Sequence, residues 1–174
     1  MSLKSGIVVL ALVLAAASLP AVGAEETPLV HEGIVAASVA EVWGAFTTKE
    51  GLESWMVAHS EIELKVGGRM RTHYDPQGKL GDSKTIENTI ICYDPRRMLS
   101  IKVSKPPEDF PFANAVKTMW TVIYFEADSP QTTRVRIVGL GFGDDEESQK
   151  MRAFFDRGNA FTLKKLQERF APKK

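Results

Sequence analysis

Apolar and polar residues alternate on both sides of the Gly67-Gly68 pair, and this alternation predicts a β-hairpin. In a strand every second side chain points to the same face, so one face of the hairpin should be apolar and the other charged. The residues expected on the apolar face are Ile62, Leu64, Val66, Met70, Thr72 and Tyr74.

The turn between these strands decides which residues pair. A two-residue turn would mix the faces, whereas a three-residue turn of Val66, Gly67 and Gly68, with one glycine at positive φ, keeps them apart. The expected partners are Leu64 with Met70, Ile62 with Thr72, and Glu63 with Arg71. This register sends His73 to the charged face near Glu61, so we expect an exposed surface histidine.

Further alternating segments predict a largely antiparallel sheet with strands over residues 29–36, 84–93, 99–104, 117–126 and 133–142. Ser38 followed by Glu41 is a capping-box pattern that begins a short helix, and a second short helix is expected over 49–55. A last helix is expected over about 146–170. Its acidic start at 144–147 suits the helix dipole, which we favour over a calcium site.

The last helix carries a broader apolar face than a surface helix needs, and such a face suits a helix held by a concave sheet. Gly139 and Gly141 share one face of the last strand with Val135 and Ile137, which indicates a close approach, a bend or space for a ligand. The residues on the helix face are Met151, Phe154, Phe155, Gly158, Phe161, Thr162, Leu166 and Phe170.

The segment 105–112 is too rich in proline for a strand and contains Phe110 and Phe112. Two interpretations remain open for it: a lid over the mouth of a cavity, or a long loop that the two phenylalanines fix to the core.

The first 24 residues predict a signal peptide. Lys4 precedes an apolar run from Ile7 to Leu19 that is shorter than a membrane span, and the small residues ending at Ala24 suit signal peptidase. We expect cleavage before Glu25, export to the periplasm or beyond the cell, and one domain over residues 25–174. An uncleaved N-terminal anchor is the alternative.

Charge and cysteine content exclude some partners. The 22 basic residues balance the 22 acidic ones, so nothing predicts binding to nucleic acid or stable insertion of the mature chain into a membrane. Cys92 is the only cysteine, which excludes an intramolecular disulfide, and we expect it to be a small core residue. The oligomeric state is open.

The sequence shows no combination of residues that is typical of a catalytic site. His31, His59 and His73 lack metal-ligand spacing, and we assign none of them to chemistry. The sequence predicts no cofactor, no metal site and no catalytic residue.

Two stretches of the chain resemble a known superfamily. They are residues 35–74, with the run Ala37 to Trp43, Ser54-Trp55 and Val66 to Met70, followed by Asp75 to Gly78, and a C-terminal part with Phe154 to Phe161 and Leu163 to Leu166. Together they resemble the SRPBCC superfamily with the helix-grip fold. Within it, they are most similar to the branch named for the C-terminal domain of the activator of the ninety-kilodalton heat-shock protein ATPase.

The resemblance implies an α+β domain: a curved antiparallel sheet wrapped around a long C-terminal helix, with two short helices between the first two strands. It also implies a hydrophobic tunnel between sheet and helix. Relatives bind lipids, sterols or other apolar molecules, some are polyketide cyclases or aromatases, and the namesakes bind a chaperone.

The leading hypothesis is an exported protein that binds a small hydrophobic molecule, lipid-like or aromatic, with Thr72 and indole N–H groups orienting it. The alternatives are a cyclase or hydrolase using Tyr74, Tyr124 or Asn88, and a protein-interaction module without an open cavity. The residues expected to bind the ligand are Trp55, Met70, Thr72, Trp120, Gly139, Met151, Phe154, Phe155 and Gly158.

Overall fold

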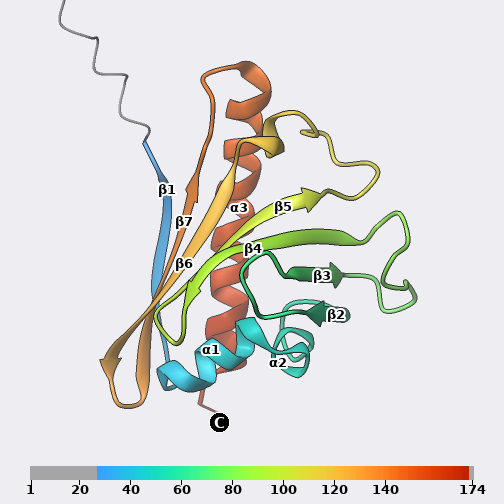
Figure 1. Ribbon diagram of the computed structural model, residues 1–174. Helices are drawn as coiled ribbons and strands as arrows, with labels where there is room; N and C mark the ends of the chain where they lie inside the picture. The colour runs from blue at the N-terminus through green and yellow to red at the C-terminus, as the bar shows by residue number, and fades with distance from the viewer. Residues whose placement is uncertain (1–26, 173–174) are drawn as a thin grey trace, which may run out of the picture.

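The computed structural model describes residues 27–172, so the predicted signal peptide lies outside the described residues. One antiparallel sheet with the strand order β1-β7-β6-β5-β4-β3-β2 forms the main layer (Figure 1). Its strands are β1 (Leu29–Val35), β2 (His59–Ile62), β3 (Arg69–His73), β4 (Ile86–Asp94), β5 (Met98–Lys105), β6 (Trp120–Ser129) and β7 (Thr132–Leu140). The helices are α1 (Val39–Thr47), α2 (Lys49–Glu53), the short 3₁₀ helix η1 (Ala115–Lys117) and α3 (Glu146–Arg169).

Two short helices connect the edge strands β1 and β2, as the capping pattern predicts. The side chain of Ser38 accepts a hydrogen bond from the backbone N–H of Glu41, and the carboxylate of Glu41 accepts one from the N–H of Ser38. The hydroxyl of Ser38 also donates to the Glu41 carboxylate at 2.6 Å, and this contact, followed by that from the Ser38 N–H, lowers the pKa of Glu41. Thr48 caps α2 by accepting from the N–H of Gly51 at 3.0 Å, so α2 follows α1 directly.

The long helix α3 runs along the face of the sheet opposite the viewer in Figure 1. Asp145 caps it by accepting from the N–H of Ser148 at 3.0 Å, and the hydroxyl of Ser148 donates to the same carboxylate at 2.7 Å. The contact from the hydroxyl, followed by that from the N–H, lowers the pKa of Asp145. The helix packs against β1 and η1, where Leu163 and Leu166 are buried. The α+β helix-grip architecture expected from the sequence is therefore present.

The hairpin register differs by two residues from the predicted one. Met70 pairs with Ile62, Thr72 with Ser60, and Arg71 with Glu61. The faces are as predicted, and Gly67 has φ +76°, but the connection is longer than a three-residue turn. Gly67 donates to the carbonyl of Ile90, so the glycines extend the pairing with β4 and do not form the hairpin tip.

The predicted exposure of His73 is wrong. Its side chain does point to the face opposite Thr72, but only 2 % of the residue is exposed, because residues 74–85 fold back over it. The ring Nε2 lies 3.0 Å from a carboxylate oxygen of Asp82, and Nδ1 accepts from the N–H of Asp75 at 3.1 Å. Alternation predicted the face and could not predict the loop that covers it.

The expectation that Cys92 is a core residue is also wrong, because Cys92 is exposed. The pairing of β4 with β5 shifts between Ile90 and Cys92, where the strand contains an irregularity of the β-bulge type. Ile90 and Tyr93 both contact the core, and Ile91 and Cys92 between them are exposed. One extra residue in the strand thus reverses the phase that strict alternation assigns to Cys92.

Three apolar clusters form the interior. The first joins α1, the sheet and the C-terminal half of α3, and includes Phe46 and Leu166. The second lies at the other end of the molecule around Met119, Phe142 and Met151, and the third is a small group around Leu52, Val57 and Met70. Members of all three clusters contribute to the wall of one cavity.

Candidate ligand cavity

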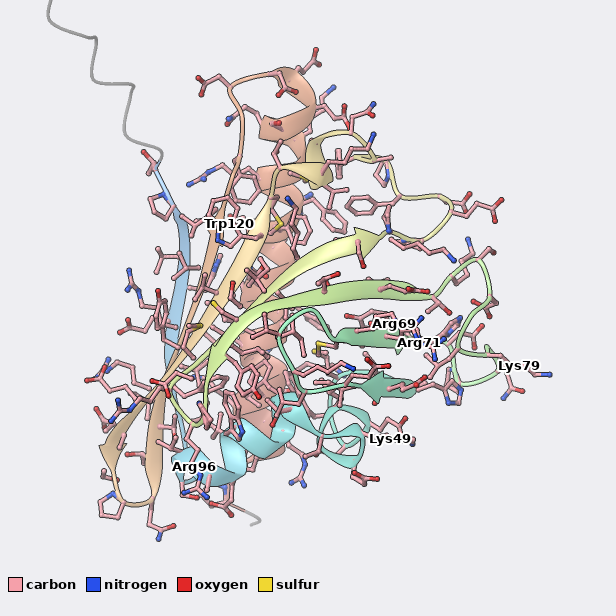
Figure 2. All side chains as sticks on the ribbon, viewed as in Figure 1. Lys49, Arg69, Arg71, Lys79, Arg96 and Trp120 are labelled. Atoms are coloured by element: carbon pink, nitrogen blue, oxygen red, sulfur yellow. The ribbon has the colours of Figure 1, made fainter. Side chains whose placement is uncertain are left out.

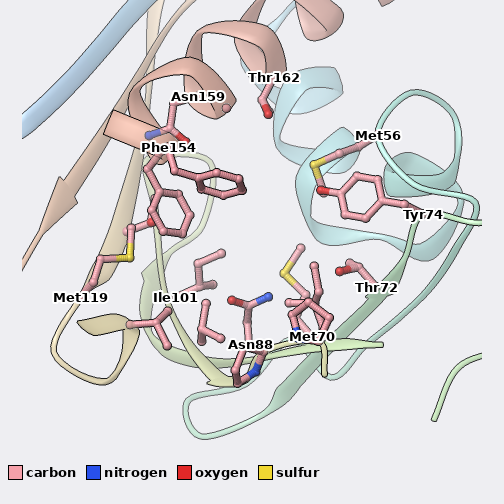
Figure 3. A pocket seen from close by; sticks show the side chains of 18 of the residues that line it. Met56, Met70, Thr72, Tyr74, Asn88, Ile101, Met119, Phe154, Asn159 and Thr162 are labelled. Atoms are coloured by element: carbon pink, nitrogen blue, oxygen red, sulfur yellow. The ribbon is translucent and has the colours of Figure 1, made fainter. Parts of the chain in front are cut away.

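A cavity of about 440 Å³ lies between α3 and the β3–β6 part of the sheet (Figure 3). This volume is within the range of roughly 300–1,000 Å³ that small-molecule sites occupy. Its apolar lining residues are Trp55, Met56, Met70, Ile86, Ile101, Val103, Pro106, Pro107, Phe110, Val116, Met119, Ile123, Phe154, Phe155, Gly158 and Phe161. The polar ones are Thr72, Tyr74, Asn88, Thr121, Asn159, Thr162 and Lys165.

Strand alternation builds the floor of the cavity. Met70 and Thr72 from β3 lie beside Ile86 and Asn88 from β4, because the register pairs Met70 with Asn88 and Thr72 with Ile86. The helix supplies the opposite wall. It leaves space there while it packs on β1, at the far edge of the sheet, and on η1, whose Val116 also lines the cavity.

The structure brings six of the nine predicted ligand-binding residues to this cavity: Trp55, Met70, Thr72, Phe154, Phe155 and Gly158. Gly158 adds open space, since a Cβ at this position would meet no atom within 4 Å. Phe154 lies at the rim with 43 % of its surface exposed.

Trp120, Gly139 and Met151 do not line the cavity. Trp120 precedes Thr121, which faces the cavity, so alternation places Trp120 (labelled in Figure 2) on the other face of the sheet. Phe142 occupies the space at Gly139, where a Cβ would lie 3.0 Å from its ring. Met151 is fully buried in the second apolar cluster beside Phe142.

The expectation that indole N–H groups orient the ligand is not supported at Trp55. Its Nε1 donates to the backbone carbonyl of Ala45 at 3.1 Å, and the ring packs edge-on against Phe46. Trp55 therefore offers the cavity an apolar ring, while its one donor fixes the ring to α1.

Asn88 and Tyr74 are polar groups that the ligand-binding prediction omitted. The amide of Asn88 points into the cavity from β4, and Tyr74 reaches it from just beyond the end of β3 with its hydroxyl turned inward (Figure 3). The residue as a whole is 59 % exposed, but desolvation at its hydroxyl raises the pKa of the Tyr74 phenol above its ordinary value. The sequence signal for Asn88 is a carboxamide at an inward position of β4, between the inward-facing Ile86 and Ile90.

One charged residue, Lys165, belongs to the described lining. It is exposed on α3, with its amine 5.6 Å from the centre of the Phe161 ring. The described lining residues include no histidine, carboxylate, cysteine or serine, so they offer no acid–base pair of ordinary type. Tyr124, considered for an enzyme, instead lies on the outer face beside Arg136.

Two other histidines lie outside the cavity. Nε2 of His31 is 3.1 Å from a carboxylate oxygen of Asp156, which joins β1 to α3. A ring nitrogen of His59 lies 3.1 Å from the carbonyl oxygen of Pro76. Among residues 27–172 no group of three or more His, Cys, Asp or Glu is arranged to hold a metal ion.

The proline-rich segment forms one side of the cavity. Pro106, Pro107 and Phe110 line it, while Phe110 and Phe112 pack against Phe154 with ring centres 5.8 and 5.7 Å away. Both interpretations of this segment therefore describe part of its structure: its phenylalanines are fixed to the second apolar cluster, and its prolines border the cavity.

Residues 36–171 match the model of the family described as activator of Hsp90 ATPase homolog 1-like protein. The chain belongs to this family. It is thereby a member of the SRPBCC superfamily, and this membership suggests hydrophobic-ligand binding in general. A search of curated proteins gave no match.

Solved structures of other proteins share the fold. A protein from Mesorhizobium loti aligns with a TM-score of 0.64 and 17% identity over 82% of this chain and 96% of its own. The Aha1 dimer from Colwellia psychrerythraea aligns with a TM-score of 0.62 and 16% identity over 83% and 96%. CalU16 from Micromonospora echinospora aligns with a TM-score of 0.59 and 16% identity over 83% and 76%.

Proposed function

We propose that this protein is an exported binding protein that holds a small, largely apolar molecule between α3 and the sheet. The observation that carries the proposal is the cavity of about 440 Å³, lined mainly by aliphatic, aromatic and methionine side chains. Burial of a ligand in such a lining is favourable by roughly 25 cal/mol per Å² of apolar surface removed from water. The methionines Met56, Met70 and Met119 can adapt to ligands of different outline.

Chaperone activation requires an ATP-driven chaperone in the cytosol. An exported protein would not meet that chaperone, so export argues for a different role. The apolar run before Ala24 is the reason to propose export. No helix within residues 27–172 is long and apolar enough to cross a membrane.

Gly158 provides a direct test. Gly158→Leu should fill the cavity from the helix side without displacing a neighbour, because the position is open. The neutral fluorescent probe N-phenyl-1-naphthylamine should bind the wild type, and the variant should lose affinity tenfold or more. The unfolding temperature should stay or rise, since glycine is about 0.8–1.0 kcal/mol less favourable in a helix than alanine and leucine ranks next to alanine.

Gly44→Leu is the matched control. Gly44 is also a helical glycine with no atom within 4 Å of a Cβ, but it lies in α1 away from the cavity lining. This substitution should leave probe binding unchanged. A wild type that never binds the probe would end the ligand-binding proposal and favour an interaction module, for which exposed apolar side chains such as Phe161 on α3 are available. Gly139→Leu is unsuitable, because Phe142 occupies that space.

A further inference from the structure

Two buried polar side chains on the cavity floor have no hydrogen-bond partner within the described part of the chain. They are Asn88 on β4 and Thr72 on β3, which are 9 % and 4 % exposed. Both line the cavity, and Figure 3 shows the Asn88 amide and the Thr72 hydroxyl directed into it. Their polar atoms are open to the cavity and are not among the unpaired atoms sealed from solvent, so the partner available to them is a group in the cavity, either water or a ligand.

The sheet register makes the two groups neighbours. Asn88 pairs with Met70 and Thr72 pairs with Ile86, which places Asn88 and Thr72 diagonally across β3 and β4 on the same face. Diagonal positions of this kind have Cα atoms roughly 7–8 Å apart, so one small group can contact both side chains. Tyr74, two residues beyond Thr72, brings a protonated hydroxyl to the same wall.

A purely structural role would favour other residues here. Leucine at position 88 and valine at position 72 would fill similar space, suit a buried strand face and avoid the cost of desolvating an amide and a hydroxyl. Costs of this kind are typical of functional sites, where the missing partner is supplied by a ligand.

The charge of the site limits what that partner can be. Asn88, Thr72 and Tyr74 are neutral, and the one charged lining residue, Lys165, lies exposed on the opposite wall. An ionised group on the floor would lose its hydration without gaining a counter-ion. A neutral group that both donates and accepts matches the amide, which offers an N–H donor and a carbonyl acceptor.

We propose that the ligand carries a neutral hydroxyl or carbonyl group that is seated between Asn88 and Thr72, with its apolar body against Phe154, Phe155 and Met119. This inference rests on the proposed function, and it makes Asn88 and Thr72 determinants of ligand specificity.

The test uses 2-naphthol and 2-methylnaphthalene, which differ by a hydroxyl in place of a methyl group, with affinities measured by displacement of N-phenyl-1-naphthylamine. Asn88→Leu should weaken 2-naphthol binding tenfold or more relative to 2-methylnaphthalene. Thr72→Val should act in the same direction and tests the inference separately if the first variant folds poorly. Thr89→Val, on the outer face of the same strand, is the matched control and should leave the ratio unchanged.

A second readout needs no ligand. Because Asn88→Leu replaces an amide that has no partner within the chain by an apolar side chain at a largely buried position, the unfolding temperature of the free protein should rise by a few degrees. A fall in unfolding temperature together with an unchanged affinity ratio would assign Asn88 a structural role and overturn the inference.

The outcomes separate the inference from the proposed function. Binding of the dye and both naphthalenes with the same affinity ratio in wild type, Asn88→Leu and Thr72→Val overturns the inference and leaves the binding function intact. Absence of all binding removes both. Tighter binding of 2-naphthoate than of 2-naphthol, abolished by Lys165→Met, would place the polar end of the ligand at Lys165 and also overturn the inference.

Discussion

The imidazole of His73 holds residues 74–85 against the outer face of β3. Its Nδ1 lies 3.1 Å from the backbone nitrogen and 3.2 Å from the carbonyl oxygen of Asp75, and its Nε2 lies 3.0 Å from a carboxylate oxygen of Asp82. Asp82 also accepts from the backbone N–H groups of Lys79 and Lys84, and these contacts, that of Lys79 first, lower its pKa. Gly78 packs directly on the ring, where a Cβ would overlap it.

This packing predicts a coupled pair of substitutions. Gly78→Ala and His73→Ala should each lower the free energy of unfolding by about 1–3 kcal/mol, the first by overpacking and the second by leaving the Asp75 N–H without its acceptor. In the double variant, Gly78→Ala should cost far less, because the ring that the new methyl group meets is gone. Chemical denaturation of the four proteins measures the coupling.

Gly44→Ala is the control for a glycine without such a contact, and it should stabilise the protein by up to about 1 kcal/mol. Simple additivity of the two losses would show that Gly78 is required for a reason other than the His73 ring.

At the scale of single residues, the sequence predicts which face of the sheet a side chain points to better than it predicts how far that side chain is buried. Alternation placed Thr72 inward and His73 outward, and both directions are confirmed. The burial of His73 and the exposure of Cys92 depend on a loop and on a strand irregularity. Neither has a signal in the local pattern of apolar and polar residues.

At the scale of elements, α3 and the segment before β6 stabilise each other. The carboxylate of Glu147 accepts from the N–H groups of Asn114 and Ala115 at 3.1 and 3.2 Å, next to the capped start of the helix. Phe110 and Phe112 then pack edge-on against each other and both contact Phe154. Phe110 lines the cavity and Phe112 does not.

This difference predicts separate effects for two similar substitutions. Phe110→Ala should weaken N-phenyl-1-naphthylamine binding severalfold, because it removes part of the cavity wall. Phe112→Ala should lower the free energy of unfolding by about 1–3 kcal/mol while leaving probe affinity nearly unchanged. Fluorescence titration and denaturation on the same samples distinguish the two. Equal losses of affinity would mean that the segment acts on the cavity as one unit.

Helix starts could be predicted from the sequence because a capping motif depends only on neighbouring residues. The capping box of Ser38 and Glu41 is confirmed, and so is the acidic start of α3. The hairpin register could not be predicted from the local sequence, because Gly67 and Gly68 pair with β4, a strand more than fifteen residues away. Local turn rules favoured a compact turn and could not include that pairing.

At the scale of the whole molecule, the cavity results from how α3 is seated. Leu163 and Leu166 anchor the helix in the first cluster and Met151 anchors it in the second, so the helix spans the sheet between two packed ends. The face between them carries Phe154, Phe155 and Gly158 over the cavity. The sequence predicted that these three residues share one face, but it also placed Phe161, which is 62 % exposed, on that face and omitted the buried Leu163. It could not show that Phe142 would fold over Gly139 and fill that part of the interior.

Export is the last prediction, and the described start of the chain is compatible with it. Arg152 on α3 donates to the carbonyl of Thr27 at 2.8 Å and to that of Pro28 at 3.2 Å, so the helix holds the chain just after the expected cleavage site. Cleavage before Glu25 would keep both contacts. The exported protein should therefore begin at Glu25, as intact mass measures, and a chain of residues 25–174 should fold.

A chain that begins at Leu29 tests the same contacts. Loss of the Thr27 and Pro28 carbonyls leaves Arg152 without these two acceptors, and the unfolding free energy should fall by about 0.5–1.5 kcal/mol relative to residues 25–174. Arg152→Ala should lower the stability of the longer chain and have a smaller effect on the shorter one, in which the two carbonyls are absent. Recovery of the uncleaved chain in the membrane fraction would instead establish the N-terminal anchor and refute export as a free protein.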